Sequence, residues 1–106
     1  MVELFLERLA QHLEQPWTLA SMAAKCGLSR SSFSGYCLEL TNATPIEYLT
    51  RVRMEAALAM LQAPELQPVT RIALACGFSS SQYFATRFRR RFGCRPSEWR
   101  RINAGS

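Results

Sequence analysis

The side chains best suited to binding chemistry lie between residues 71 and 93, in the segment RIALACGFSSSQYFATRFRRRFG. A short apolar run ends at Gly77, and glycine can take the left-handed conformation that a tight turn between two helices requires. Ser79 or Ser80 can then cap a second helix by accepting a hydrogen bond from a backbone N–H. This order of apolar run, glycine turn and serine cap predicts two short helices joined by a turn.

Phe84 and Phe88 lie one turn apart in the second of these helices, so we expect both to face a core. The opposite surface is polar at its start and basic toward its end: it carries Gln82, Thr86 and Arg89, and Ser81 and Tyr83 flank them. In a recognition helix the N-terminal side chains meet base edges, and cations farther along meet phosphates. The segment therefore predicts a helix-turn-helix that contacts nucleic acid.

Positive charge is concentrated in the second half of the 106-residue chain. Residues 1–50 carry 3 cationic and 5 acidic side chains, a formal charge of −2, whereas residues 51–106 carry 10 arginines and 3 glutamates, a charge of +7. Twelve of the 13 cationic side chains are arginine, which can bind phosphates and guanine edges through two hydrogen bonds. This asymmetry favours a polyanionic partner. A solvated arginine surface is the alternative.

The residues that other kinds of site need are scarce. There is no aspartate and one histidine, His12, so a catalytic triad, a carboxylate pair or a His-rich metal site is hard to assemble. Cys26, Cys37, Cys76 and Cys94 lack C-x-x-C spacing and are expected to be small buried side chains in a reducing cytosol. No apolar run is long enough to cross a membrane, and no signal-peptide pattern opens the chain. We expect no enzyme, no metal or cofactor, and a cytoplasmic location.

An internal repeat relates the two halves of the chain. Residues 22–29 (MAAKCGLS) align with residues 72–79 (IALACGFS) at an offset of 50. After one inserted residue the alignment continues, and it pairs Phe33 with Phe84, Asn42 with Gly93, Pro45 with Pro96, Glu47 with Glu98, and Tyr48 with Trp99. The apolar positions stay in phase throughout, so the sequence predicts a second helix-turn-helix unit near the N-terminus.

Apolar spacing predicts helices at both ends of the chain and within the first unit. An amphipathic helix is expected over Val2–Glu14. In the second helix of the first unit the side chains expected to face inward are Phe33, Cys37 and Leu40. In a last short helix over residues 96–103, we expect Trp99 to face inward and Arg100 and Arg101 to lie outside.

A long helix is predicted between the two units. It begins at Thr44-Pro45, a cap followed by proline in the first helical position, and continues to Ala63-Pro64. Its length of roughly 28 Å is close to one turn of B-DNA, about 34 Å, so a rigid connector could place both recognition helices in adjacent grooves. A core helix of a bundle has the same pattern. The predicted division is residues 1–43, 44–63 and 64–106.

The chain resembles a known family most strongly in three stretches, GFSSSQYFATRFRRRFGCRPSEWRR, RVRMEAALAML and PVTRIALACGF. Together they resemble the DNA-binding domain of AraC/XylS-type bacterial transcription regulators, from about Leu4 to Arg101. The resemblance implies an all-α fold of seven helices, with two helix-turn-helix subdomains joined by a long linker helix and contacts to two successive major-groove segments. It also implies a missing effector-sensing or dimerisation domain in a longer regulator. A short family member without such a domain is the alternative.

The resemblance assigns base-contacting positions to Ser31, Ser34, Gly35, Ser81, Gln82, Tyr83 and Thr86. The side chains that we expect at DNA phosphates are Arg30, Arg53, Ser79, Arg87, Arg89 and Arg90. Gln82 can bridge the N6/N7 edge of adenine, and Thr86 offers a methyl group to thymine. An internal salt bridge is the alternative for Arg53, and Arg91 and Arg95 can simply be solvated.

The serines of the first unit leave few side chains that could reach a base edge. We therefore expect this unit to supply mostly positioning and shape readout, and the second unit most of the direct discrimination. Together the residues and the resemblance predict sequence-specific binding to a double-stranded DNA operator. This binding would regulate transcription, as an activator that contacts RNA polymerase. The alternative is a helical module that binds protein or RNA without base-specific DNA contacts.

Overall fold

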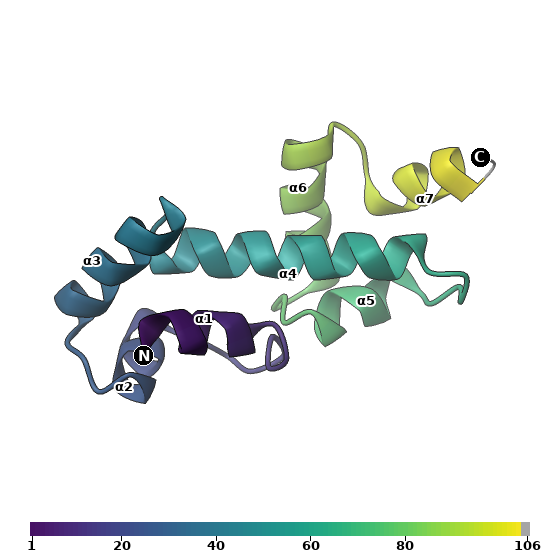
Figure 1. The fold of residues 1–106 in the computed structure, drawn as a ribbon. Helices are drawn as coiled ribbons and strands as arrows, with labels where there is room; N and C mark the ends of the chain where they lie inside the picture. Colours follow the sequence, from purple (N-terminus) through teal and green to yellow (C-terminus); the bar gives the residue numbers. More distant parts are fainter. Residues whose placement is uncertain (105–106) are drawn as a thin grey trace. The chain divides into compact units, whose positions relative to one another are not determined.

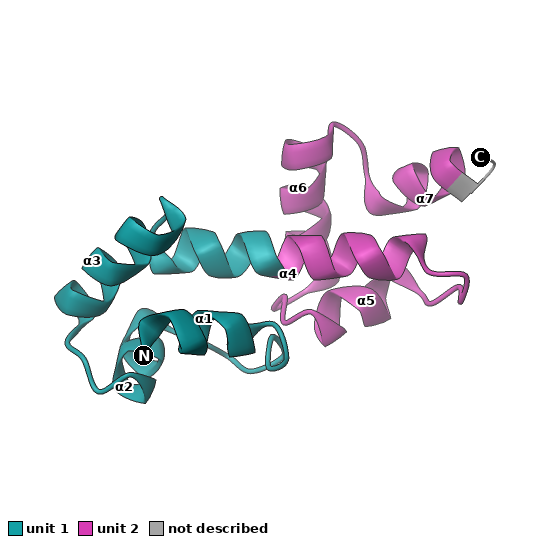
Figure 2. Ribbon diagram, viewed as in Figure 1, with its two compact units in different colours: residues 1–52 teal, residues 53–106 magenta. Residues whose placement is uncertain are grey.

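The computed structural model describes residues 1–104, which form seven α-helices and no strand (Figure 1). The helices are α1 Val2–Leu9, α2 Leu19–Lys25, α3 Arg30–Thr41, α4 Pro45–Gln62, α5 Val69–Ala75, α6 Ser81–Phe92 and α7 Pro96–Ala104. These helices make two compact units, residues 1–52 and the described residues from Arg53 onward, with the boundary inside α4 (Figure 2). The predicted all-α fold with seven helices is confirmed.

The first unit has a core shared by α1, α2, α3 and the start of α4. Phe33 and Cys37 of α3 are completely buried, and the side chains of Leu9 and Met22 are almost completely buried. The Phe5 ring meets that of Phe33 edge-on, with centroids 5.9 Å apart. Burial of this aromatic and aliphatic surface stabilises the unit, because each large apolar side chain removed from water contributes about 1.5–3 kcal/mol.

The first helix is shorter than the apolar spacing predicts. It ends at Leu9, and the chain continues through turns in which the N–H of His12 donates to the carbonyl oxygen of Leu9 at 3.0 Å. The indole N–H of Trp17 in turn donates to the carbonyl oxygen of His12 at 2.8 Å. Leu13 stays buried although it lies beyond the helix. The prediction of a helix to Glu14 was wrong because apolar spacing does not reveal the hydrogen bond from Trp17 to the backbone of His12, which holds this segment in turns.

The second unit is built around a row of aromatic rings. Phe84 and Phe88 are fully buried, as predicted, with ring centroids 5.7 Å apart. Phe78 from the turn, Phe92 and Trp99 extend the row, with centroid distances of 4.9, 4.6 and 6.4 Å to their neighbours. Aliphatic side chains of α4 and α5 complete this core. The rings fix α6 against α4, α5 and α7 within this unit.

Two predicted side-chain orientations were wrong. Leu40 is 45% exposed rather than inward, since the face of α3 that packs in the core is the one that carries Phe33 and Cys37. Arg100 is partly buried rather than outside, and its Nη1 donates to the carbonyl oxygen of Gln67 at 2.6 Å. Its Nε and Nη2 are buried without a hydrogen-bond partner among the described residues.

Candidate nucleic-acid interface

The turn between α5 and α6 has the geometry that the glycine and serine pattern predicts. Gly77 has a φ of 91°, and the N–H of Phe78 donates to the carbonyl oxygen of Ala73 at 3.0 Å. Of the two candidate caps it is Ser80 that accepts the N–H of Tyr83, at 3.0 Å. Gly93, with a φ of 81°, ends the helix. The first turn of α6 is therefore held by a side-chain cap as well as by its buried phenylalanines.

The surface of α6 away from its phenylalanines is polar and strongly basic. Gln82, Thr86 and Arg90 are exposed and follow one another at intervals of four residues, so they form one stripe along the helix. Tyr83 and Arg89, both exposed, border this stripe. Ser81 and Arg87 are partly buried. The stripe places an amide and a threonine before an arginine, which is the order that base and phosphate contacts along a recognition helix require.

The hydroxyl group of Thr86 is already engaged within the helix. It donates to the carbonyl oxygen of Gln82 at 3.0 Å. Its methyl group and the acceptor side of its oxygen remain for a partner, whereas its proton does not. An apolar contact to a thymine methyl group is therefore the interaction that Thr86 is best placed to make.

Arg53 of α4 belongs to the same unit as α6. Burial lowers the pKa of its guanidinium, and the charges of Tyr83 and Cys76 oppose this change. The structure thus brings Arg53 into the electrostatic neighbourhood of Tyr83, a predicted base-contacting residue. Ser79, just before the cap, is exposed, as a phosphate contact requires.

The turn between α2 and α3 repeats this geometry in the first unit. Gly27 has a φ of 66°, and Ser29 caps α3 by accepting the N–H of Ser32 at 3.2 Å. Asn42, at a φ of 58°, ends α3 where Gly93 ends α6. Both units are helix-turn-helix structures with matching caps, which confirms the predicted duplication.

The exposed face of α3 has little of the chemistry found on α6. Arg30, Ser31 and Gly35 are exposed, whereas Ser34 is partly buried. A Cβ placed on Gly35 would have nothing within 4 Å. Beyond Arg30 the helix has no cation. The predicted residues of the first unit therefore all lie on α3, and those of the second lie on α6 except Ser79 and Arg53. The side chains on α3 are shorter and less charged than those on α6.

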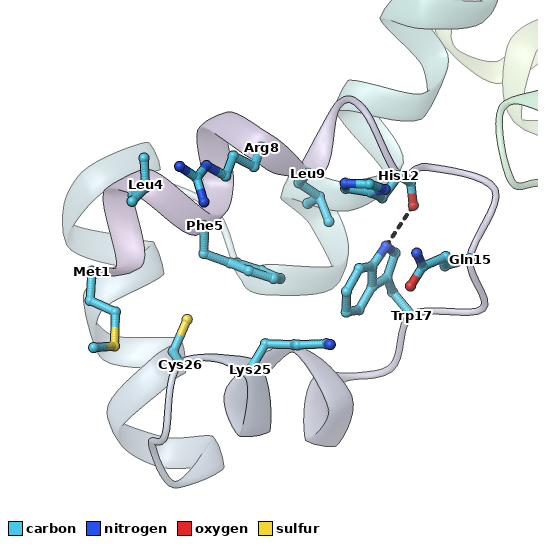
Figure 3. Close-up of a pocket in the computed structure, with 10 residues that line it drawn as sticks. All are labelled: Met1, Leu4, Phe5, Arg8, Leu9, His12, Gln15, Trp17, Lys25 and Cys26. Carbon is cyan, nitrogen blue, oxygen red and sulfur yellow. Dashed lines mark hydrogen bonds between the residues drawn. The ribbon is translucent and has the colours of Figure 1, made fainter.

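A separate hollow of about 440 Å³ lies beside α1 and α2 in the first unit (Figure 3). Phe5 and Trp17, whose rings meet edge-on at 5.5 Å, form its apolar part. Arg8, His12 and Lys25 also line it. His12 is exposed, so it is a surface residue.

Three cysteines are buried, and the fourth, Cys94, is partly buried. Burial raises the pKa of the Cys76 thiol to about 11, and Cys76 donates to the sulfur of Met60 at 3.6 Å. Burial likewise raises the pKa of Cys26 and Cys37. These thiols stay protonated at neutral pH and pack as small apolar side chains, as predicted.

Two capped helix pairs, each with a helix whose exposed face begins with polar side chains, define the class of helix-turn-helix DNA-binding domains. A family profile described as a helix-turn-helix domain matches residues 22–102. The chain belongs to the AraC/XylS family of transcription regulators.

Relatives and solved structures agree with this family. The RCS-specific transcriptional activator RclR of Escherichia coli K12 is 37% identical over 95 residues, which are 87% of this chain and 33% of RclR. The activator RhaR of Mannheimia succiniciproducens is 32% identical over 99 residues, 93% of this chain and 36% of RhaR. The chain thus spans about a third of the length of these relatives.

The fold matches that of known DNA-binding domains. The DNA-binding domain of AdpA, solved in complex with a target DNA, superposes with a TM-score of 0.90 at 26% identity, over 95% of this chain and 90% of that domain. The C-terminal domain of AraT, a response regulator from Geobacillus stearothermophilus, gives 0.87 at 30% identity, over 96% and 84%. None of the helices within residues 1–104 has the length and hydropathy needed to cross a bilayer.

Proposed function

We propose that this chain binds double-stranded DNA in a sequence-specific way and regulates transcription. The observation that carries the proposal is the exposed stripe of Gln82, Thr86 and Arg90 on a helix that buried rings hold in place. In this assignment Ser81, Gln82, Tyr83 and Thr86 contact bases, and Arg53, Ser79, Arg87, Arg89 and Arg90 contact phosphates. We assign no catalytic step to the chain, and we infer that it acts in the bacterial cytoplasm, where an operator would lie.

The first unit has a lesser part in this function. We assign base contacts to Ser31, Ser34 and Gly35 and a phosphate contact to Arg30, with most of the binding arising from shape and position. The short side chains of α3 and the partial burial of Ser34 support this division. Direct discrimination between bases then falls mainly on α6.

We further propose that α4 is the connector between two reading units, within the division into residues 1–43, 44–63 and 64–106. Its 18 residues correspond to a length of about 27 Å. This length supports insertion of α3 and α6 into successive segments of one major groove, which are about 34 Å apart.

The regulatory setting is also a proposal. RclR and RhaR carry the word activator in their names and are about three times as long as the matching region. We infer that this chain is the DNA-binding part of a longer regulator with an effector-sensing or dimerisation domain, and that it activates transcription through contact with RNA polymerase.

Selection from a pool of random duplexes tests the DNA proposal. The chain is mixed with the pool at several salt concentrations, and the retained duplexes are sequenced. We expect two motifs about one helical turn apart and a steep loss of affinity as salt rises. Uniform retention of all sequences, or equal retention of an RNA pool, would contradict base-specific DNA binding.

Two matched variants then test which of the two units selects bases directly. Gln82→Ala should relax the base preference in one of the two motifs. Ser31→Ala should lower affinity slightly and leave the preferences unchanged. Equal loss of discrimination from both substitutions would show that α3 also selects bases directly.

A further inference from the structure

The internal repeat offers a direct comparison of two helices with the same architecture. α3 and α6 each have 12 residues, a serine cap and a left-handed end. Both bury the aromatic residue at their fourth position, Phe33 in α3 and Phe84 in α6. Differences between their exposed positions therefore reflect what each helix contacts rather than how it folds.

In the C-terminal halves of α3 and α6, equivalent positions carry different types of side chain. The residues of α3 and their equivalents in α6 are Tyr36 and Arg87, Leu38 and Arg89, Glu39 and Arg90, and Leu40 and Arg91. Four arginines in one unit thus correspond to three apolar or aromatic side chains and a carboxylate in the other. The surface that is cationic in the second unit therefore has no cation at the equivalent positions of the first.

The apolar side chains of this half-helix are widely exposed. Tyr36 is 50% exposed, Leu38 53% and Leu40 45%. Tyr36 and Leu40 lie one turn apart on one flank of α3, and Leu38 lies on the other flank. Contiguous apolar side chains that are exposed in this way mark binding surfaces. The tyrosine among them belongs to the residue types that are enriched at protein interfaces.

Two hollows flank Tyr36 and Glu39, which line both. One, of about 510 Å³, is a shallow and open depression on α3 itself, bordered by Leu38 and by Gly35, which is also a proposed base contact. The other, of about 410 Å³, extends to Leu28 and Leu40 and to the start of α1. Such hollows can accept apolar side chains of a partner, one on each side of Tyr36.

The charges at these hollows are acidic. Glu3 of α1 and Glu39 of α3 line them, against the α-amino group of Met1, and no lysine or arginine is among the described residues that do so, so acidic charge predominates. Two exposed carboxylates beside an apolar surface repel a polyanion and attract a cationic partner.

We propose that the α3 docking surface, formed by Tyr36, Leu38, Glu39 and Leu40 with Leu28 and Glu3, binds a basic amphipathic helix of a partner protein. Apolar side chains of that helix occupy the two hollows, and its lysines or arginines pair with the two carboxylates. This is recognition of a helix by an apolar groove with charged borders. Docking here goes beyond DNA binding and does not depend on whether α6 contacts bases.

A second copy of the chain is a poorer occupant than a basic partner. In a symmetric dimer the same surface meets itself, so the carboxylates of Glu3 and Glu39 would face those of the other copy. Like charges brought together in this way oppose association. A helix of another protein that carries positive charge can bind this surface without such repulsion.

The test uses the 106-residue chain and two fluorescent helical peptides, one of leucine and arginine and a twin in which every arginine is glutamate. Binding is followed by anisotropy. We expect saturable one-to-one binding of the arginine peptide and none of its twin. Leu40→Ser and Glu39→Lys should each weaken that binding about fivefold or more, as loss of a central interface side chain does.

Leu4→Ser is the matched control, because Leu4 is 48% exposed and borders the other hollow of the same unit, which Arg8 and Lys25 line. We expect it to leave the affinity for the arginine peptide unchanged. Circular dichroism melts confirm that all variants fold. Equal binding of both peptides, or equal loss from Leu4→Ser and Leu40→Ser, overturns the proposal.

Two further measurements separate docking from other uses of this surface. If Leu40→Ser weakens DNA binding as much as peptide binding, the surface belongs to the DNA interface and the proposal fails. If the chain sediments as a dimer that Leu40→Ser abolishes, a second copy is the occupant and the proposal fails. A Gln82→Ala variant without any DNA defect counts against the proposed DNA reading only, since it leaves the peptide measurements unaffected.

Discussion

At the scale of single residues, hydrogen bonds within a helix limit what a side chain can offer to DNA. Thr86 gives its hydroxyl proton to the carbonyl oxygen of Gln82. Its methyl group is the part left for base contact, and thymine is the base with a methyl group in the major groove.

Thr86→Val keeps this methyl group and Thr86→Ser removes it, so we expect the valine variant to keep the thymine preference and the serine variant to lose it. Replacing the contacted thymine by deoxyuridine should weaken wild type and Thr86→Val about fourfold, the contribution of one methyl group, and leave Thr86→Ser unchanged. Fluorescence anisotropy with both duplexes measures this. Equal sensitivity of all three proteins to deoxyuridine would show that the thymine methyl group does not contact the methyl group of Thr86.

Gly35 is a second residue whose surroundings lead to a prediction. It lies inside α3, with open space where a Cβ would be. Gly35→Ala should therefore raise the free energy of unfolding by about 0.5–1 kcal/mol, since alanine is the better helix former. Thermal unfolding followed by circular dichroism tests this.

The control for this prediction is Gly93→Ala. Gly93 has a φ of 81°, and the left-handed conformation costs other residues about 1–2 kcal/mol, so this variant should be less stable. A Gly35→Ala protein that is more stable yet binds DNA less tightly would indicate a close approach of the α3 backbone to DNA. A destabilised Gly35→Ala protein would show that the glycine has a structural role in the fold.

At the scale of the elements, hydrogen bonds at the N-terminal ends of α2 and α4 determine where these helices begin. Thr18 and Ser21 form a reciprocal cap at α2. Thr44 and Glu47 do the same at α4, with distances of 3.2 and 3.3 Å, and these bonds lower the pKa of the Glu47 carboxyl. These caps give α2 and α4 a defined start, whereas α5 begins after Pro68 without a side-chain cap.

Two adjacent serines before α6 have different roles. Ser80 accepts the N–H of Tyr83, whereas Ser79 is not the cap. Ser80→Ala should lower the free energy of unfolding by about 1 kcal/mol, and Ser79→Ala should leave it nearly unchanged. Urea unfolding of both variants measures this difference. If the two substitutions cost the same, the cap does not hold the first turn of α6 in solution.

The elements also show where apolar spacing misled. Leu13 is buried as its spacing indicates, but it lies in turns rather than in α1. Leu40 fits the spacing of α3 and is nevertheless exposed. The repeat could have corrected the second error, because it pairs Leu40 with Arg91, an exposed residue of α6. Repeats compare equivalent positions, whereas spacing alone gives only one face of one helix.

At the scale of the whole molecule, the uneven charge leads to a prediction about salt. The arginines of α6 account for much of the +7 of residues 51–106. Each arginine at a phosphate releases about one counterion on binding, so Arg90→Gln should reduce the slope of log K against log salt by about 1. Filter binding at several salt concentrations measures the slope.

Arg91 supplies the control for this measurement. Its guanidinium lies over the Phe92 ring, 5.2 Å from the centroid, and no phosphate contact is assigned to it. We expect the slope of Arg91→Gln to match that of wild type. Equal slopes for wild type and Arg90→Gln would remove Arg90 from the phosphate-contacting set.

The sequence by itself determined the helical class, the duplication, the glycine turns and the inward direction of Phe84 and Phe88. These features depend on interactions between residues a few positions apart, such as caps and pairs one turn apart, and a linear pattern records them. Gln82, Thr86 and Arg89 could be proposed for the same reason, because they lie on the face opposite the phenylalanines of α6. The other candidate residues of this helix came from the family resemblance.

Only the tertiary structure decided which serine caps α6, where α1 ends, and how far Ser34, Ser81, Arg87 and Arg100 are buried. It alone revealed that Tyr36, Leu38 and Leu40 form an exposed surface between two acidic hollows. Burial depends on side chains that are distant in sequence, as Phe5 and Phe33 are, or Arg100 and Gln67. No local pattern contains such contacts, because they exist only once the helices have packed.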